Sequence, residues 1–124
     1  MLAVKIYSRA YIDTAEKRYA ALLETLSDDT PPAVCNHLAL ALDRYFLHRL
    51  RSSEGGDGNA LNELRMIADG VAECGGVMTR DATIDYRPED SVLGIAIGSE
   101  LALRPADLKK LAKSVFAEVR KRFT

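Results

Sequence analysis

The stretch Arg44–Arg65, which reads RYFLHRLRSSEGGDGNALNELR, decides how this chain folds. Apolar residues repeat at helical spacing on both sides of its centre, where three glycines lie within four positions. Glycine adopts backbone conformations that other residues avoid, and it commonly ends helices. We therefore predict a bend near position 56 that brings two amphipathic helices together and gathers arginines, a histidine and amide side chains in one neighbourhood.

Two helices are predicted to flank this bend. The first covers residues 32–51, and its apolar stripe consists of Val34, Leu38, Leu42, Phe46 and Leu50. The second follows the N-cap residue Asn59 and ends at Gly75–Gly76. The first of these helices is apolar around much of its circumference, which indicates a central position or contact with a partner chain.

Two more helices are predicted towards the ends of the chain. One covers residues 13–26 and opens with a capping box formed by Asp13 and Glu16. The other begins at Pro105, carries Asp107 in its first turn, and runs close to the C-terminus.

Residues 83–86 and 100–103 instead alternate between polar and apolar side chains, and residues 92–97 form a short apolar run, and both patterns favour β-strands. We predict short strands over 83–86, 92–97 and 100–103, with a two-residue turn at Gly98–Ser99. Residues 1–10 are predicted to form a strand or an extended arm. The expected fold is a single mainly α domain over residues 1–124, with four helices and a small antiparallel β-hairpin or three-stranded sheet (α+β) between helices three and four.

Length and composition exclude several classes of protein. The chain has 124 residues, of which 48% are hydrophobic and 28% charged, which is typical of a globular domain and not of a disordered one. It has no apolar run near the ~20 residues of a membrane span and no signal-peptide core. Two cysteines 39 residues apart do not suggest a disulfide scaffold. These features predict a cytoplasmic protein that is not bound to a membrane.

Charge is unevenly distributed although the formal net charge is only -1. Residues 54–100 hold ten acidic and three basic residues, whereas residues 101–124 hold seven basic and two acidic ones. The basic final helix is interpreted as a solvated face that partly neutralises the acidic middle of the chain. Contact with an acidic partner, or with nucleic acid through Lys109–Arg122, is the alternative.

The candidate binding residues all lie within the stretch that contains the bend. Three interpretations of them remain open: a structural polar network that fixes the turn, a protein-contact surface, or a clamp for a small anionic ligand. No catalytic residue, metal ligand or cofactor is predicted, because no recognised motif is present and His37 and His48 would lie ~16 Å apart along one helix. The candidate residues are His48, Arg49, Arg51, Asp57, Asn59, Asn62, Glu63 and Arg65.

The same stretch carries a family resemblance. With residues 75–79, 90–98 and 116–123, it resembles a family of short bacterial proteins that have the motif LDxYFxHRxRxxEGKDGNPLNEVRxL and no assigned activity. This chain departs from the motif at Gly56, where the family has Lys, and at Ala60, where it has Pro. The resemblance covers roughly residue 40 to the C-terminus and implies a shared fold, with no residue role to carry over.

We therefore predict a non-catalytic protein-interaction or regulatory module that binds a protein partner or forms a homo-oligomer. The second hypothesis is a binding module or minor enzyme for a phosphorylated small molecule. The third is nucleic-acid binding through the basic C-terminal helix.

Overall fold

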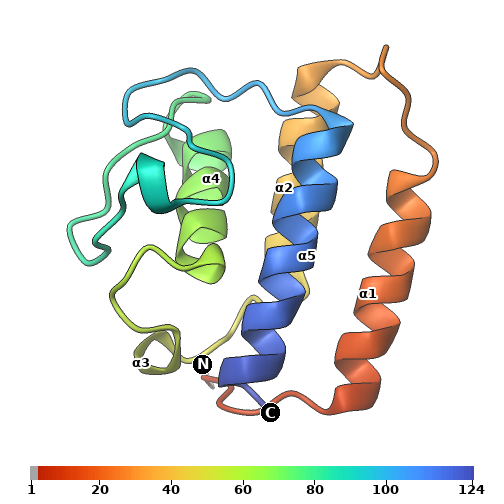
Figure 1. Cartoon of the computed structure of the whole chain (residues 1–124), viewed down its shortest axis with the longest axis vertical. Coiled ribbons are helices and arrows are strands. Elements are labelled where there is room, and N and C mark those ends of the chain that lie inside the picture. The colour runs from red at the N-terminus through yellow and green to blue at the C-terminus, as the bar shows by residue number, and fades with distance from the viewer. Residues whose placement is uncertain (1–2) are drawn as a thin grey trace.

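The computed structural model describes residues 3–124, which form five α-helices and one 3₁₀ turn. Figure 1 shows these helices as a bundle with the C-terminus at its base. No helix in this part of the chain combines the length and the apolar content needed to cross a membrane. The elements are α1 (Arg9–Leu23), α2 (Pro32–Arg44), α3 (Arg51–Glu54), α4 (Ala60–Glu73), η1 (Pro88–Asp90) and α5 (Pro105–Arg122).

Helix α5 lies at the centre of the bundle. It packs against α1 on one side and against α4 and α2 on the other, and α2 also packs along α4 (Figure 1). Its buried face explains this position, since apolar residues recur along it every three or four positions. The buried residues of α5 are Leu108, Leu111, Ala112, Val115, Phe116 and Val119.

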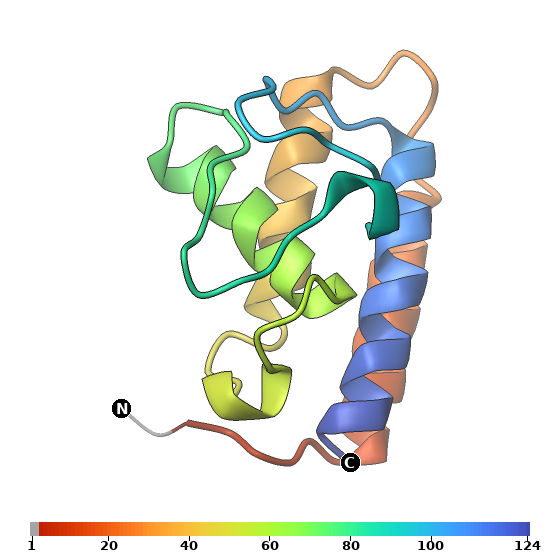
Figure 2. The ribbon, with the colours of Figure 1, turned by 60° about the vertical axis from the view of Figure 1, so that its left-hand side comes forward.

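The predicted β-hairpin or three-stranded sheet is wrong. Residues 3–124 contain no strand, and only isolated bridges form, such as Val77 with Glu100. Figure 2 shows the segment between α4 and α5 crossing over α4 as an irregular chain. The predicted turn at Gly98–Ser99 does not join two strands, because Gly98 N–H donates to Met78 O and Met78 N–H donates to Ser99 O.

Buried side chains replace the missing strand partners. The Asn36 side chain donates to Leu101 O at 2.8 Å and accepts from Leu103 N–H at 2.9 Å, which is the pattern of a neighbouring strand residue. An alternating sequence favours a strand only where a partner strand is available, and here α2 supplies the hydrogen bonds instead.

The helix predicted over residues 32–51 is also too long. Helix α2 ends at Arg44, and residues 45–48 continue as tight turns. The chain then extends at Arg49, because Val4 N–H donates to His48 O and Leu50 N–H donates to Val4 O. Of the predicted strand or extended arm over residues 1–10, Val4 forms this single bridge and residues 9 and 10 belong to α1, whereas residues 1 and 2 lie outside the described part.

The predicted capping box of α1 is wrong as well. The helix begins at Arg9, four residues earlier than expected, because the Ser8 hydroxyl accepts a hydrogen bond from Tyr11 N–H. Asp13 and Glu16 instead form ion pairs with Arg120 of α5, each at 2.8 Å. The N-cap at Asn59 and the start of α5 at Pro105 are confirmed.

Candidate functional site

Glu54 is fully buried, and three arginine side chains surround its carboxylate. Arg65 donates from Nη2 to Oε1 at 2.7 Å and from Nε to Oε2 at 3.2 Å. Arg51 donates from Nη1 to Oε2 at 3.1 Å, and Arg49 forms an ion pair through its Nε with Oε1. A carboxylate removed from water is tolerated where opposite charges and hydrogen bonds compensate it, and the guanidinium groups provide both.

Local backbone geometry places the Glu54 side chain between the three arginines. It is the last residue of α3, and Gly55 follows with a φ of 78°, a left-handed conformation that glycine adopts most readily. The chain reverses there, so that Arg51 lies one turn before Glu54 while Arg65 reaches it from the second turn of α4. Gly55 O accepts from Arg51 at 2.8 Å, which also fixes the reversal.

Two asparagines hold the loop between α3 and α4. The Asn59 side chain accepts from Leu61 N–H and Asn62 N–H, as an N-cap does, and donates to Glu54 O at 2.8 Å. The Asn62 side chain accepts from Arg51 at 2.9 Å and donates to Asp57 O at 2.6 Å. Both asparagines therefore satisfy backbone groups that the turn would leave unpaired.

The C-terminal end of α5 closes the network. Arg122 donates from Nη1 to Glu54 O at 2.8 Å and forms an ion pair with Glu118 at 2.6 Å. Its Nη2 also lies 3.6 Å from a carboxylate oxygen of Asp57. A hydrogen bond from Asn59 and the charge of Arg122 hold the pKa of Asp57 below its ordinary value.

Glu63 belongs to a different arrangement. It is fully buried on α4, and its two carboxylate oxygens accept from Val92 N–H at 2.8 Å and from Leu93 N–H at 2.9 Å. Burial raises the pKa of Glu63, and the two backbone hydrogen bonds offset only part of that increase. This residue pins the loop after η1 and does not contact the arginines.

The structure thus brings together six of the eight candidate residues. Glu63 lies apart, as does His48, which is exposed and in the described chain takes part in hydrogen bonding through its backbone carbonyl. The residues that form the network are Arg49, Arg51, Asp57, Asn59, Asn62 and Arg65.

The residue at the centre of the network, Glu54, was not among the candidates. The available signal was its place between Arg49, Arg51 and Arg65 in the sequence, together with the Gly55–Gly56 pair that lets the chain turn there. Asp43, which accepts from Arg49 at 2.8 Å, was not among the candidates either.

This arrangement limits what the cluster can do chemically. The Glu54 carboxylate occupies the position that a bound phosphate or carboxylate would take between the arginines. Within residues 3–124, no group of three or more His, Cys, Asp or Glu side chains is placed to hold a metal ion. The arginines of the cluster are therefore paired within the chain, across the α3–α4 turn.

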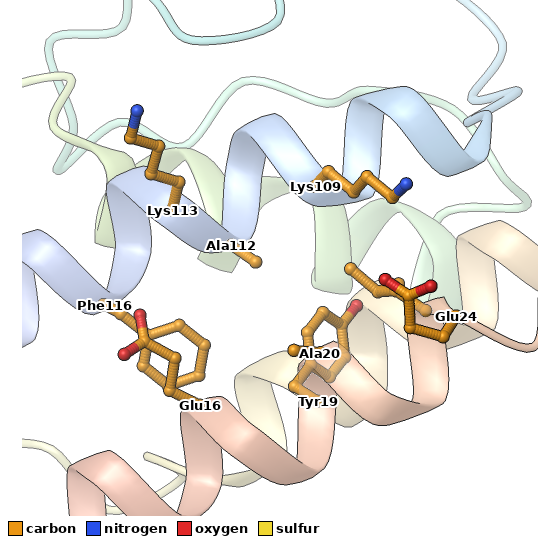
Figure 3. A pocket seen from close by; sticks show the side chains of 9 residues that line it. Glu16, Tyr19, Ala20, Glu24, Lys109, Ala112, Lys113 and Phe116 are labelled. Carbon is orange, nitrogen blue, oxygen red and sulfur yellow. The ribbon is translucent and has the colours of Figure 1, made fainter.

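A groove between α1 and α5 is the second candidate site. It has a volume of about 330 Å³, within the range of pockets that hold organic ligands or anchoring side chains. Figure 3 shows α1 and α5 side by side around it, with Ala112 directed into the space. Its floor is apolar and its rim carries glutamates from α1 and lysines from α5; the lining residues are Glu16, Tyr19, Ala20, Leu23, Glu24, Lys109, Ala112, Lys113 and Phe116.

Comparison with known proteins gives this chain no relatives: no family model, curated protein or solved structure matches it. The resemblance to the short bacterial family stays a prediction from the motif. The function must be argued from the two sites themselves.

Proposed function

We propose that this chain is a non-catalytic, cytoplasmic protein-interaction module, and that its docking surface is the groove between α1 and α5. The observation that carries this proposal is the composition of the groove. An apolar floor with a charged rim is the arrangement of surfaces that receive an amphipathic segment of a partner.

The walls of the groove are suited to close approach. Ala20 on α1 is exposed, whereas Ala112 on α5 is buried with 7% of its surface exposed, and neither side chain extends beyond its Cβ. The Tyr19 ring, which also lines the groove, is fixed because its hydroxyl donates to Leu38 O at 2.7 Å. A partner side chain can therefore reach a rigid apolar floor without first displacing other groups, which lowers the ordering cost of binding.

The contacts of the arginine cluster favour this function over binding of a phosphorylated small molecule. Arg49, Arg51 and Arg65 already hold the Glu54 carboxylate, so an incoming phosphate would have to displace a buried side chain. Nucleic-acid binding through α5 has less support for a similar reason. Two of its arginines, Arg120 and Arg122, are engaged with carboxylates of the same chain.

Selection from a displayed library of helical peptides tests the docking surface. We expect peptides selected on the unmodified chain to lose binding to Ala20→Arg, which places a long charged side chain in the groove. Ala21→Arg is the matched control, because Ala21 is the adjacent exposed residue of α1 and does not line the groove. Peptides that bind both variants equally would show that the groove is not the docking surface.

A further inference from the structure

The two walls of the α1–α5 groove carry opposite charges. Glu16 and Glu24 lie on the α1 wall, and Lys109 and Lys113 lie on the α5 wall (Figure 3). Glu16 is engaged by Arg120 at 2.8 Å. Glu24, Lys109 and Lys113 have no ion-pair partner among residues 3–124, so three of the four rim charges are available to a bound molecule.

A surface with one acidic and one basic wall complements itself under two-fold symmetry. When the two-fold axis runs along the groove, the acidic wall of each molecule lies against the basic wall of the other, because a two-fold interface uses the same patch twice. The helices support this geometry. They run antiparallel, since the start of α1 pairs with the end of α5 through Asp13 and Arg120 (Figure 1).

We propose that the occupant of the groove is a second copy of this chain. In the dimer, Glu24 of each copy faces Lys109 and Lys113 of the other. This inference rests on the proposed function and names the partner that it leaves open.

Charge disfavours the other occupants. A uniformly acidic partner, including nucleic acid or an anionic membrane, meets Glu16 and Glu24 on one wall, and a uniformly basic partner meets the two lysines on the other. The formal net charge of -1 leaves little long-range repulsion between two copies of the chain.

Charge reversal on each wall separates this dimer from other modes of binding. Glu24→Lys replaces the unpaired acidic charge of the α1 wall with a basic one, and the pair Lys109→Glu with Lys113→Glu makes both walls acidic. We expect each variant alone to raise the dimer dissociation constant at least about ten-fold, since every attractive pair becomes repulsive in both halves of the interface. An equimolar mixture of the two variants should restore a dimer, because the basic groove then faces the acidic one.

Sedimentation equilibrium at low salt measures these constants, and far-ultraviolet circular dichroism verifies that each variant is folded. Glu16 is left unchanged because Arg120 depends on it. Glu73→Lys and Lys121→Glu reverse charges outside the groove and should leave the constant unchanged.

Three results would overturn the inference: a monomer at millimolar concentration, reversals that act no more strongly than these controls, or a mixture of folded variants that stays monomeric. Library peptides blocked by Ala20→Arg would still support the docking surface in that case, so the two proposals can fail separately.

Discussion

Glu54 and Glu63 lie nine positions apart and are both fully buried, yet they are accommodated in opposite ways. Three guanidinium groups surround Glu54, whereas Glu63 is held by two backbone N–H groups and only the more remote charge of Lys110. Formal charges compensate the carboxylate of Glu54, whereas the dipoles of backbone N–H groups compensate the carboxylate of Glu63. Burial raises the pKa of Glu63 because dipoles offset its desolvation less completely than full charges would.

The largest effect is expected from Glu54→Gln. It keeps the shape of the side chain but leaves the three arginines without their central negative charge. Removing one partner of a buried ion pair typically costs about 3–5 kcal/mol, and we expect a loss of unfolding free energy in that range. Urea denaturation measures it, with Glu73→Gln on the exposed side of α4 as the control.

A loss below about 1 kcal/mol for Glu54→Gln would mean that the arginines are adequately solvated without the carboxylate. A further check uses Glu54→Ala, which opens space between the guanidinium groups. Added acetate should then raise the Tm of this variant and not that of the unmodified chain.

A smaller loss of unfolding free energy is expected from Glu63→Gln, because this substitution leaves no buried positive charge without its partner. One of the two backbone N–H groups, of Val92 or of Leu93, then faces an amide nitrogen and loses its acceptor. We expect a cost of about 1–3 kcal/mol, the penalty of one unsatisfied buried donor. Hydrogen exchange should accelerate at these two amides and stay unchanged at Leu101, which lies in the neighbouring loop.

The pH dependence of stability tests how Glu63 is accommodated. The pKa of Glu63 is raised in the folded state above its ordinary value of 4.5, so the folded chain holds this proton more tightly than the unfolded chain. The resulting stabilisation is fully present below about 4.5 and is lost as pH rises through the folded pKa. The unfolding free energy of the unmodified chain minus that of Glu63→Gln should therefore fall from pH 4 to pH 8. A difference that grows over this range would contradict the raised pKa of Glu63.

The smallest expected effect is the response to phosphate. Because Glu54 occupies the position between the arginines, nucleotides and sugar phosphates at millimolar concentration should leave the Tm of the unmodified chain unchanged. A ligand that binds only the folded state raises the unfolding free energy by RT ln(1 + [L]/Kd), and Tm rises with it. A reproducible increase would restore the hypothesis of a phosphorylated ligand at Arg49, Arg51 and Arg65.

The sequence predicted the elements whose signals are local. Asn59 caps α4 and Pro105 opens α5 because a cap depends on the few residues around it. The sequence also indicated the part of the chain in which the network lies, because the residues of the network flank a bend that contains glycines. The roles of Glu54 and Asp43 were not predicted, since whether a carboxylate repels a ligand or takes its place depends on where the side chain points, even though the position of Glu54 among the arginines was visible in the sequence.

Apolar periodicity and the glycines by themselves determined a mainly helical chain with a turn that gathers the arginines. Only the tertiary structure decided that residues 83–103 form no strands, because their backbone groups bond to Asn36 and Glu63, which are remote in sequence. It also decided that the arginines hold a carboxylate of their own chain, and that α1 and α5 leave a groove between opposite charges. Each of these outcomes depends on pairs of residues that the folded chain brings together, and a local pattern carries no information about such pairs.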